Sequence, residues 1–188
     1  MLLRKKFLLF CLVALLSMAF GCSSSPTQEG TGEFVDDAAI TTKVKAEILQ
    51  APSLKSSEIN VETFKGVVQL SGFVGSQAEV ATAADVARKV PGVKDVRNDV
   101  LVKSVGTSAT EGAGGYVDDT AITAKVKAAL LKESNLKSTE INVETVQGVV
   151  QLSGFGGNQA EANTAAELAG KVEGVKSVKN DIRIKGNQ

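Results

Sequence analysis

Apolar residues recur along the first part of this chain at helical spacing. Ile40, Val44 and Ile48 are four residues apart, which places them on one face of a helix. The spacing predicts a helix over residues 37–50, and Pro52 then ends the pattern because proline cannot donate the next backbone hydrogen bond.

The spacing then changes to a strict alternation of apolar and polar residues. Residues 59–64 alternate, and so do residues 67–73, which is typical of half-buried strands. Between them lies the dipeptide Lys65-Gly66. Two alternating runs across a short glycine turn predict a β-hairpin.

Helical spacing returns after the hairpin, over residues 77–90, with small side chains on the apolar face. An alanine-rich face allows a helix to approach a sheet closely. Residues 93–102 predict a last strand, and an apparent change of phase near Arg97-Asn98 predicts a β-bulge. The apolar residues of the helix and of the strand are Val80, Ala83, Ala84, Ala87, Val90, Val93, Val96, Val100 and Val102.

The whole pattern occurs twice. Residues 34–102 align without a gap on residues 116–184, at a constant offset of 82, and most aligned positions are identical. The first predicted helix therefore recurs over residues 119–132, and the turn of the hairpin recurs as Gln147-Gly148. The chain contains a duplicated domain rather than a solenoid, whose repeats are shorter.

The order of elements predicts an α+β fold made of two tandem αββαβ domains. Each is expected to have a three-stranded mixed sheet with two helices on one face, since the last strand reaches a parallel neighbour through the second helix. Domains of this size are marginal alone, so we expect some packing of one copy on the other. The predicted segments are a signal peptide (1–21), a polar tether (22–33), domain 1 (34–103), a flexible linker (104–115) and domain 2 (116–185).

The N-terminus predicts export. Basic residues 4–6 precede an uncharged run of residues 7–20, which is too short to span a membrane and is typical of a signal peptide. Cys22 follows Gly21 as in a bacterial lipobox, although Ala19 stands where leucine is usual. We expect Cys22 to be lipidated; the alternative is cleavage elsewhere, which would leave Cys22 as a free thiol.

Charge and composition exclude several functions. Basic and acidic residues both total 21, and removal of the three signal bases leaves 18 against 21, so a basic nucleic-acid binder is not expected. The chain has no histidine, hence no Ser-His-Asp or Cys-His arrangement. We predict no catalytic residue, no metal site and no cofactor.

Two repeated features could carry chemistry but are interpreted as architecture. The pairs Asp36-Asp37 and Asp118-Asp119 could act as acid and base or bind a cation, yet acids that open a helix are more often caps. The recurring glycines are interpreted as turn glycines at the ends of elements. They are Gly72, Gly92, Gly154 and Gly174.

Basic residues near the end of the second helix and in the last strand are the candidate membrane contacts, because lysine and arginine are attracted to anionic lipid surfaces. The region of the first helix is an equal competitor, through Ile40 with Lys43 and Ile122 with Lys125. The six candidates are Lys89, Lys94, Arg97, Lys171, Lys176 and Lys179.

Two motifs give the repeat a family resemblance. Residues 68–73 read Val-Gln-Leu-Ser-Gly-Phe and residues 92–99 read Gly-Val-Lys-Asp-Val-Arg-Asn-Asp, with partners at 150–155 and 174–181. In this context they resemble the BON domain family. The resemblance implies a non-enzymatic envelope protein that binds membrane phospholipid or envelope proteins and supports envelope integrity or osmotic stress tolerance. It implies an outer-membrane lipoprotein facing the periplasm or, alternatively, a soluble periplasmic stress protein or chaperone.

Overall fold

The computed structural model describes residues 31–103, called domain 1 here, and residues 118–186, called domain 2. The predicted signal peptide, the linker over 104–115 and Cys22 lie outside the described residues. The elements of domain 1 are α2 (Thr31–Gln50), β1 (Ile59–Phe64), β2 (Val67–Val74), α3 (Gln77–Arg88), β3 (Asp95–Asn98) and β4 (Leu101–Val102). Those of domain 2 are α4 (Asp119–Lys132), β5 (Ile141–Val146), β6 (Val149–Gly156), α5 (Gln159–Gly170) and β7 (Ser177–Ile184). A short 3-10 helix precedes β1 and another precedes β5.

Each domain has the predicted α+β fold. In domain 1 the central strand β2 pairs antiparallel with β1 and parallel with β3 and β4. In domain 2 the central strand β6 pairs antiparallel with β5 and parallel with β7. The mixed three-stranded sheet expected from the sequence is therefore confirmed in both copies.

The hairpin turns are the best anticipated local feature. Lys65 and Gly66 have φ angles of 52° and 81°, and Gln147 and Gly148 have 54° and 80°. Two consecutive residues with positive φ form the tight turn whose twist matches the flanking strands. Glycine at the second position meets this requirement without strain, because it has no Cβ atom.

The predicted bulge in the last strand is wrong. The pairing of β2 with β3 and of β2 with β4 keeps one register, from Leu70 opposite Asn98 to Phe73 opposite Leu101, so no residue is inserted. The apparent change of phase arises because Asn98 occupies a position that faces α3. Its side-chain amide donates to the main-chain oxygen of Val80 at 2.9 Å, which satisfies a polar group on an otherwise apolar face.

The first helix begins earlier than predicted in domain 1 and where predicted in domain 2. The carboxylate of Asp37 accepts hydrogen bonds from the backbone N–H groups of Lys65 and Gly66 instead of capping its own helix. The helix α2 starts at Thr31, within the segment expected to be tether. In domain 2, Asp118 caps α4 by accepting from the N–H of Thr120 at 3.1 Å, as predicted.

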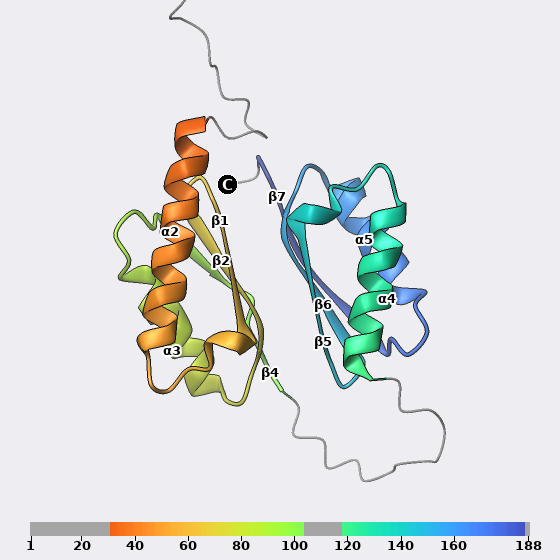
Figure 1. Cartoon of the computed structure of the whole chain (residues 1–188), viewed down its shortest axis with the longest axis horizontal. Helices are drawn as coiled ribbons and strands as arrows, with labels where there is room; N and C mark the ends of the chain where they lie inside the picture. Colours follow the sequence, from red (N-terminus) through yellow and green to blue (C-terminus); the bar gives the residue numbers. More distant parts are fainter. Residues whose placement is uncertain (1–30, 104–117, 187–188) are drawn as a thin grey trace, which may run out of the picture.

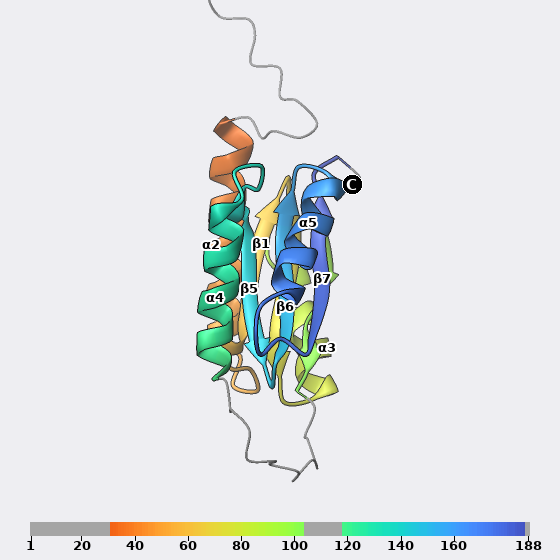
Figure 2. The ribbon, with the colours of Figure 1, turned by 90° about the vertical axis from the view of Figure 1, so that its right-hand side faces the viewer.

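The two domains form four layers. Figure 1 shows the helices of each domain on the outside and the two sheets facing each other in the middle. The view at right angles in Figure 2 shows α2 and α4 on one side of the molecule and α3 and α5 on the other. Within each domain the apolar core lies between the helices and the sheet, and includes Val44, Ile48, Leu70 and Ala83 in domain 1 and Val126, Leu130, Leu152 and Ala165 in domain 2.

The sheet face away from the helices is polar and buried between the domains. Gln69 and Gln151 are each 1% exposed, and Ser71 and Ser153 are also buried. Their alternation with apolar residues in β2 and β6 therefore does not mark a solvent face. The hydroxyl groups of Ser71 and Ser153 are hydrogen-bonded at 2.8 Å. The packing of one copy on the other that the sequence led us to expect is confirmed.

The prediction that Gly72 and Gly154 are turn glycines is wrong. Both lie inside central strands, with φ angles of 118° and 119°. A Cβ atom at Gly72 would lie 2.2 Å from the main-chain oxygen of Glu58, so a side chain has no room there. Gly92 and Gly174 do lie in the loops before the last strands, as predicted. Within the described ranges, no helix is both long and apolar enough to cross a membrane.

Candidate functional site

The site begins with a buried carboxylate that fixes the hairpin turn beside α2. Asp37 is 4% exposed, and one of its oxygens accepts from Gly66 N–H at 2.7 Å while the other accepts from Lys65 N–H. Both N–H groups of a turn with positive φ angles point to the same side, so one carboxylate can accept from both. Asp119 binds the turn of domain 2 in the same way, at 2.6 and 2.8 Å. These aspartates position a turn, which corrects their predicted role as helix caps.

Two adjoining hollows lie on the surface of domain 1, next to this turn. One, of about 270 Å³, lies between the middle of α2, the turn and the loop before β3. The other, of about 400 Å³, lies between the end of α2 and the end of α3. Lys43 and Pro91 line both hollows. We call the pair the lysine groove, after its four lysines, which are Lys43, Lys65, Lys89 and Lys94.

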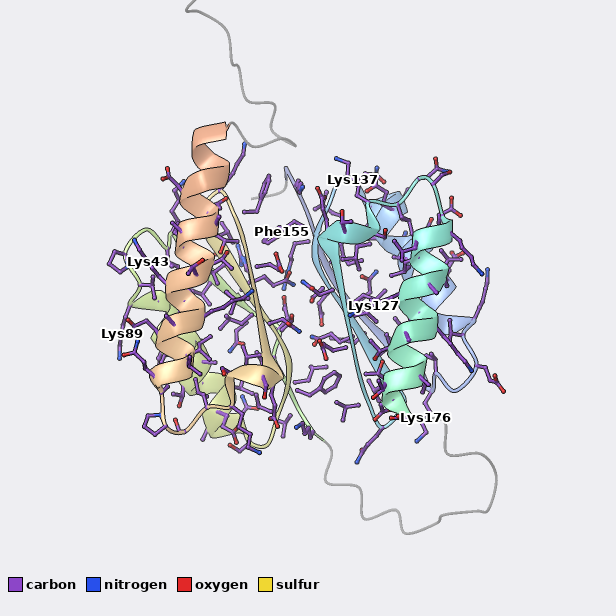
Figure 3. The ribbon with its side chains drawn as sticks, viewed as in Figure 1. Lys43, Lys89, Lys127, Lys137, Phe155 and Lys176 are labelled. Carbon is purple, nitrogen blue, oxygen red and sulfur yellow. The ribbon has the colours of Figure 1, made fainter. Side chains whose placement is uncertain are left out.

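Three of these lysines have no anionic partner in the described part of the chain. Lys43, Lys89 and Lys94 make no ion pair among the residues that the structure describes. The fourth lysine differs, because the Nζ atom of Lys65 lies 5.7 Å from the centre of the Phe64 ring. Figure 3 places Lys43 and Lys89 on the outer side of domain 1, away from domain 2. The groove therefore presents several exposed lysine side chains to solvent.

Acidic residues only partly offset this charge. Asp36, Asp37 and Glu47 also line the hollows, but Asp37 is buried and bound to the turn. The floor is apolar and includes Ile40 and Val90, which are buried in the core. A groove with lysines on its rim and an apolar floor can hold an anion that carries an apolar part.

Gly66 also sets the position of Lys94. A Cβ atom at Gly66 would lie 2.9 Å from two carbons of the Lys94 side chain, so the stem of Lys94 lies directly over the turn. In domain 2, a Cβ atom at Gly148 would lie 3.0 Å from the Cγ atom of Lys176, so the stem of Lys176 lies over its turn in the same way. The glycine that the turn requires therefore also makes room for the lysine stem.

Domain 2 lacks part of this charge arrangement. Its counterpart of Lys65 is Gln147, and its counterpart of Pro91 is Glu173. Glu173 forms an ion pair of 3.1 Å with Lys125, the counterpart of Lys43. The equivalent surface of domain 2 thus has one lysine fewer and another lysine paired.

The structure brings together two regions that the sequence presented as competitors. Lys89 and Lys94, from the end of the second helix and the last loop, line the same groove as Lys43 from the first helix. Lys65 was not identified as a site residue from the sequence, because only the folded structure places it beside Asp37 of α2. Of the other candidates, Arg97 is paired with Asp95 at 3.0 Å and Lys179 with Asp181 at 3.7 Å, and Lys171 and Lys176 are exposed on domain 2.

One carboxyl group away from the groove has a shifted pKa. Lys103 is bonded to Glu58 at 2.8 Å, and this contact holds the pKa of Glu58 below its ordinary value, against a smaller opposing effect of burial. The contact joins the 3-10 helix to the end of β4. Lys185 and Glu140 repeat it in domain 2 at 2.9 Å. Across the described ranges, no three His, Cys, Asp or Glu side chains are grouped so that they could hold a metal ion.

The fold and the groove define a class: a protein of two small αββαβ modules, packed sheet to sheet, with charged outer surfaces. The chain belongs to the BON domain family, which matches residues 36–104 and 118–186. The predicted family is therefore confirmed for both copies.

Several curated proteins resemble most of the chain. Osmotically-inducible protein Y of Escherichia coli is 46% identical over 82% of this chain and 75% of its own length. Outer membrane lipoprotein DolP of Haemophilus influenzae is 30% identical over 79% of this chain and 74% of its own length. A 21 kDa hemolysin of Actinobacillus pleuropneumoniae is 32% identical over 78% of this chain and 73% of its own length.

Proposed function

We propose that this protein is a non-enzymatic cell-envelope protein that is anchored through a lipid on Cys22 and binds anionic phospholipid at the lysine groove. The observation that carries the proposal is the convergence of Lys43, Lys89 and Lys94, none of which has an ion pair in the described part of the chain, on a groove with an apolar floor. The names of the relatives support a place in the envelope and a role in osmotic stress.

The chemistry of the groove fits a phosphate headgroup. Each lysine contributes about 1 kcal/mol when it lies near an anionic membrane surface. The apolar floor suits the glycerol and the first methylene groups of a lipid better than it suits inorganic phosphate. Lys171 and Lys176 of domain 2 would add a weaker contact, while Arg97 and Lys179 are already paired and would add least.

The anchor would keep the groove near its ligand. A lipidated Cys22 predicts an outer-membrane lipoprotein facing the periplasm, and an unmodified Cys22 predicts a soluble periplasmic protein. Mass spectrometry of the mature N-terminus, on protein from the membrane fraction, tests this part alone. We expect the acylated mass on Cys22; an N-terminus cut elsewhere, without lipid, would refute the anchor but not the groove.

Vesicle flotation tests the groove. The full mature chain with Cys22→Ser, which cannot be acylated, is mixed with vesicles of phosphatidylcholine alone or with added phosphatidylglycerol. We expect binding only to the anionic vesicles, with strong dependence on salt. Equal binding to both kinds of vesicle would refute headgroup recognition.

The duplication supplies a matched control. The triple substitution K43Q/K89Q/K94Q in domain 1 removes three charges, and K125Q/K171Q/K176Q removes three charges from the equivalent positions of domain 2. At about 1 kcal/mol for each lysine, the first variant should lose on the order of a hundredfold in affinity. The second should lose no more than about thirtyfold, since Lys125 is already paired and only two unpaired lysines are removed. Equal losses would mean that net charge, not the groove, governs binding.

A second candidate function is that of a periplasmic stress protein that holds other envelope proteins. Leu49 and Leu131 favour it, because they occupy equivalent helix positions and are 70% and 67% exposed. Such exposed leucines could contact apolar segments of an unfolded protein. If this function holds, L49S/L131S should abolish suppression of aggregation of an unfolded outer-membrane protein and leave vesicle flotation unchanged.

A further inference from the structure

The face of each sheet that meets the other domain has its polar groups satisfied by that domain. The side-chain nitrogen of Gln69 donates to the main-chain oxygen of Asp181 at 2.7 Å, and its oxygen accepts from Gly154 N–H at 2.9 Å. The same nitrogen also donates to the carboxylate of Asp99 in its own domain, at 2.8 Å. Gln69 therefore uses both donors and its acceptor, as a buried amide must.

Every one of these contacts has a counterpart with the domains exchanged. Gln151 donates to the main-chain oxygen of Asp99 at 2.6 Å and to the carboxylate of Asp181 at 2.8 Å, and it accepts from Gly72 N–H at 2.8 Å. The bond between Ser71 and Ser153 joins equivalent atoms, so it lies on the axis of this pattern. At the rim, Asn60 donates to Glu144 at 3.1 Å and Asn142 donates to Glu62 at 3.0 Å.

Such reciprocity is the hallmark of an isologous interface, in which the same patch is used on both sides. It normally joins two copies of one protein, and here it joins two copies within one chain. Nothing in the contacts themselves requires that the two domains belong to the same chain.

A few contacts do not follow this symmetry. They favour the pairing of domain 1 with domain 2 over the pairing of two like domains. Arg183 donates to the carboxylate of Asp99 at 3.2 Å, whereas the counterpart of Arg183 in domain 1 is Leu101. The rings of Phe64 and Phe155 lie 5.5 Å apart, and Figure 3 shows Phe155 between the two halves. The nitrogen of Lys185 lies 5.2 Å from the centre of the Phe64 ring.

Neither pair of like domains keeps all of these contacts. Two copies of domain 1 would lack the arginine, although Phe73 and Lys103 stand where domain 2 has Phe155 and Lys185. Two copies of domain 2 would lack the first phenylalanine, whose counterpart is Val146. The partner preferred by domain 1 is therefore domain 2, whichever chain supplies it.

We infer that a second copy of this chain is a partner for the inner sheet faces, and that domain 1 of one chain pairs with domain 2 of another to form an exchanged dimer. Within one chain the partner domain is present at an effective concentration on the order of millimolar. The closed single chain therefore prevails in dilute solution. Exchange takes over when one face of the chain is blocked or when the local concentration of chains is high.

Two full-length variants with opposite faces blocked test the inference, both with Cys22→Ser. The first carries S71C/S153R and the second carries S71D/S153C, and one of them has an affinity tag. In each variant one unpaired charge in the buried centre opposes closure of its own chain, whereas in the exchanged mixed dimer the arginine of the first chain faces the aspartate of the second. In the mixture, the new thiol at position 71 of the first chain should face the new thiol at position 153 of the second. The two should lie within disulfide distance, because the hydroxyl groups they replace are 2.8 Å apart.

Mild oxidation should give covalent dimers, and more than half of them should contain one chain of each kind. Half is the share expected if the two kinds of chain formed disulfides at random. A mixture that stays monomeric, or mixed dimers at or below the random share, would overturn the inference. Far-UV circular dichroism of each variant checks that the domains remain folded.

A gentler pair of variants covers the case in which the buried charges unfold the protein. Chains with only Ser71→Cys and chains with only Ser153→Cys are unfolded together at high concentration, refolded and oxidised, again with Cys22→Ser. Exchange predicts covalent dimers that contain one chain of each kind, in amounts that rise with the protein concentration during refolding. Only monomers at every concentration would overturn the inference.

Discussion

The two domains differ very little on their inner faces and differ clearly on their outer surfaces. The inner faces use the same glutamine, serine and glycine in both copies, with the same bonds. On the outside, Lys65 and Pro91 of domain 1 are replaced by Gln147 and Glu173 in domain 2. The inner faces therefore hold the pair together, and the function should be sought where the copies have diverged.

The largest effects should come from the apolar cores, where the two copies are alike. Leu70 and Leu152 are fully buried at equivalent positions. Replacement of either by alanine should lower the free energy of unfolding by about 2–5 kcal/mol, through lost burial and the cavity that remains. Thermal or denaturant unfolding measures both, and losses that differ by more than about 1.5 kcal/mol would show that the cores are not equivalent.

An intermediate effect is expected at the inner faces. Gln151→Ala leaves Gly72 N–H without an acceptor and the main-chain oxygen of Asp99 without this donor. Each buried group left unsatisfied costs about 1–3 kcal/mol, unless the domains separate and water replaces the lost partner.

Separation would appear as an increase in the radius of gyration measured by small-angle X-ray scattering. Gln69→Ala is the matched control and should behave in the same way, because the contacts are reciprocal. The double variant Q69A/Q151A should lose less free energy of unfolding than the sum of the two single losses, since both residues belong to one network. If the two losses of stability were additive, the two glutamines would not belong to one shared interface.

The smallest effect concerns pH. The pKa of Glu58 is lowered by its bond to Lys103, so the ionised carboxylate stabilises the fold. This contribution is fully present above the ordinary pKa of about 4.3 and is lost as the pH falls through the lowered value. Lys103→Met should remove less than about 1 kcal/mol at pH 7, because the pair is partly exposed. The variant and the parent should become equally stable in acid, and a difference that persists there would contradict the assignment.

The sequence predicts most of the fold because local signals agree with the tertiary structure. The Lys65-Gly66 turn and the duplicated hairpin follow from alternation and from the need for positive φ. What fails depends on contacts that are distant in sequence. Asp37 binds a turn 28 residues away instead of capping its helix, and the predicted bulge failed because Asn98 bonds to α3.

The candidate site shows the same division. Lys89 and Lys94 could be found from the sequence as basic residues close to one another. Their meeting with Lys43 and Lys65 depends on how α2 packs beside the hairpin turn, and no local spacing encodes that packing. Gln69 looked like a solvent residue, because alternation shows that a strand has two faces but cannot show what covers the second.

Exchange of the diverged residues between the two domains is the decisive test of lipid binding at the lysine groove. K65Q/P91E gives domain 1 the residues of domain 2, and Q147K/E173P does the reverse, each in the full mature chain with Cys22→Ser. We predict that the first variant binds anionic vesicles about thirtyfold more weakly than the parent, and that the second binds more tightly, because each variant changes two charges and each charge contributes about 1 kcal/mol at the surface. If both variants bind as the parent does, the lysine groove is not the lipid site.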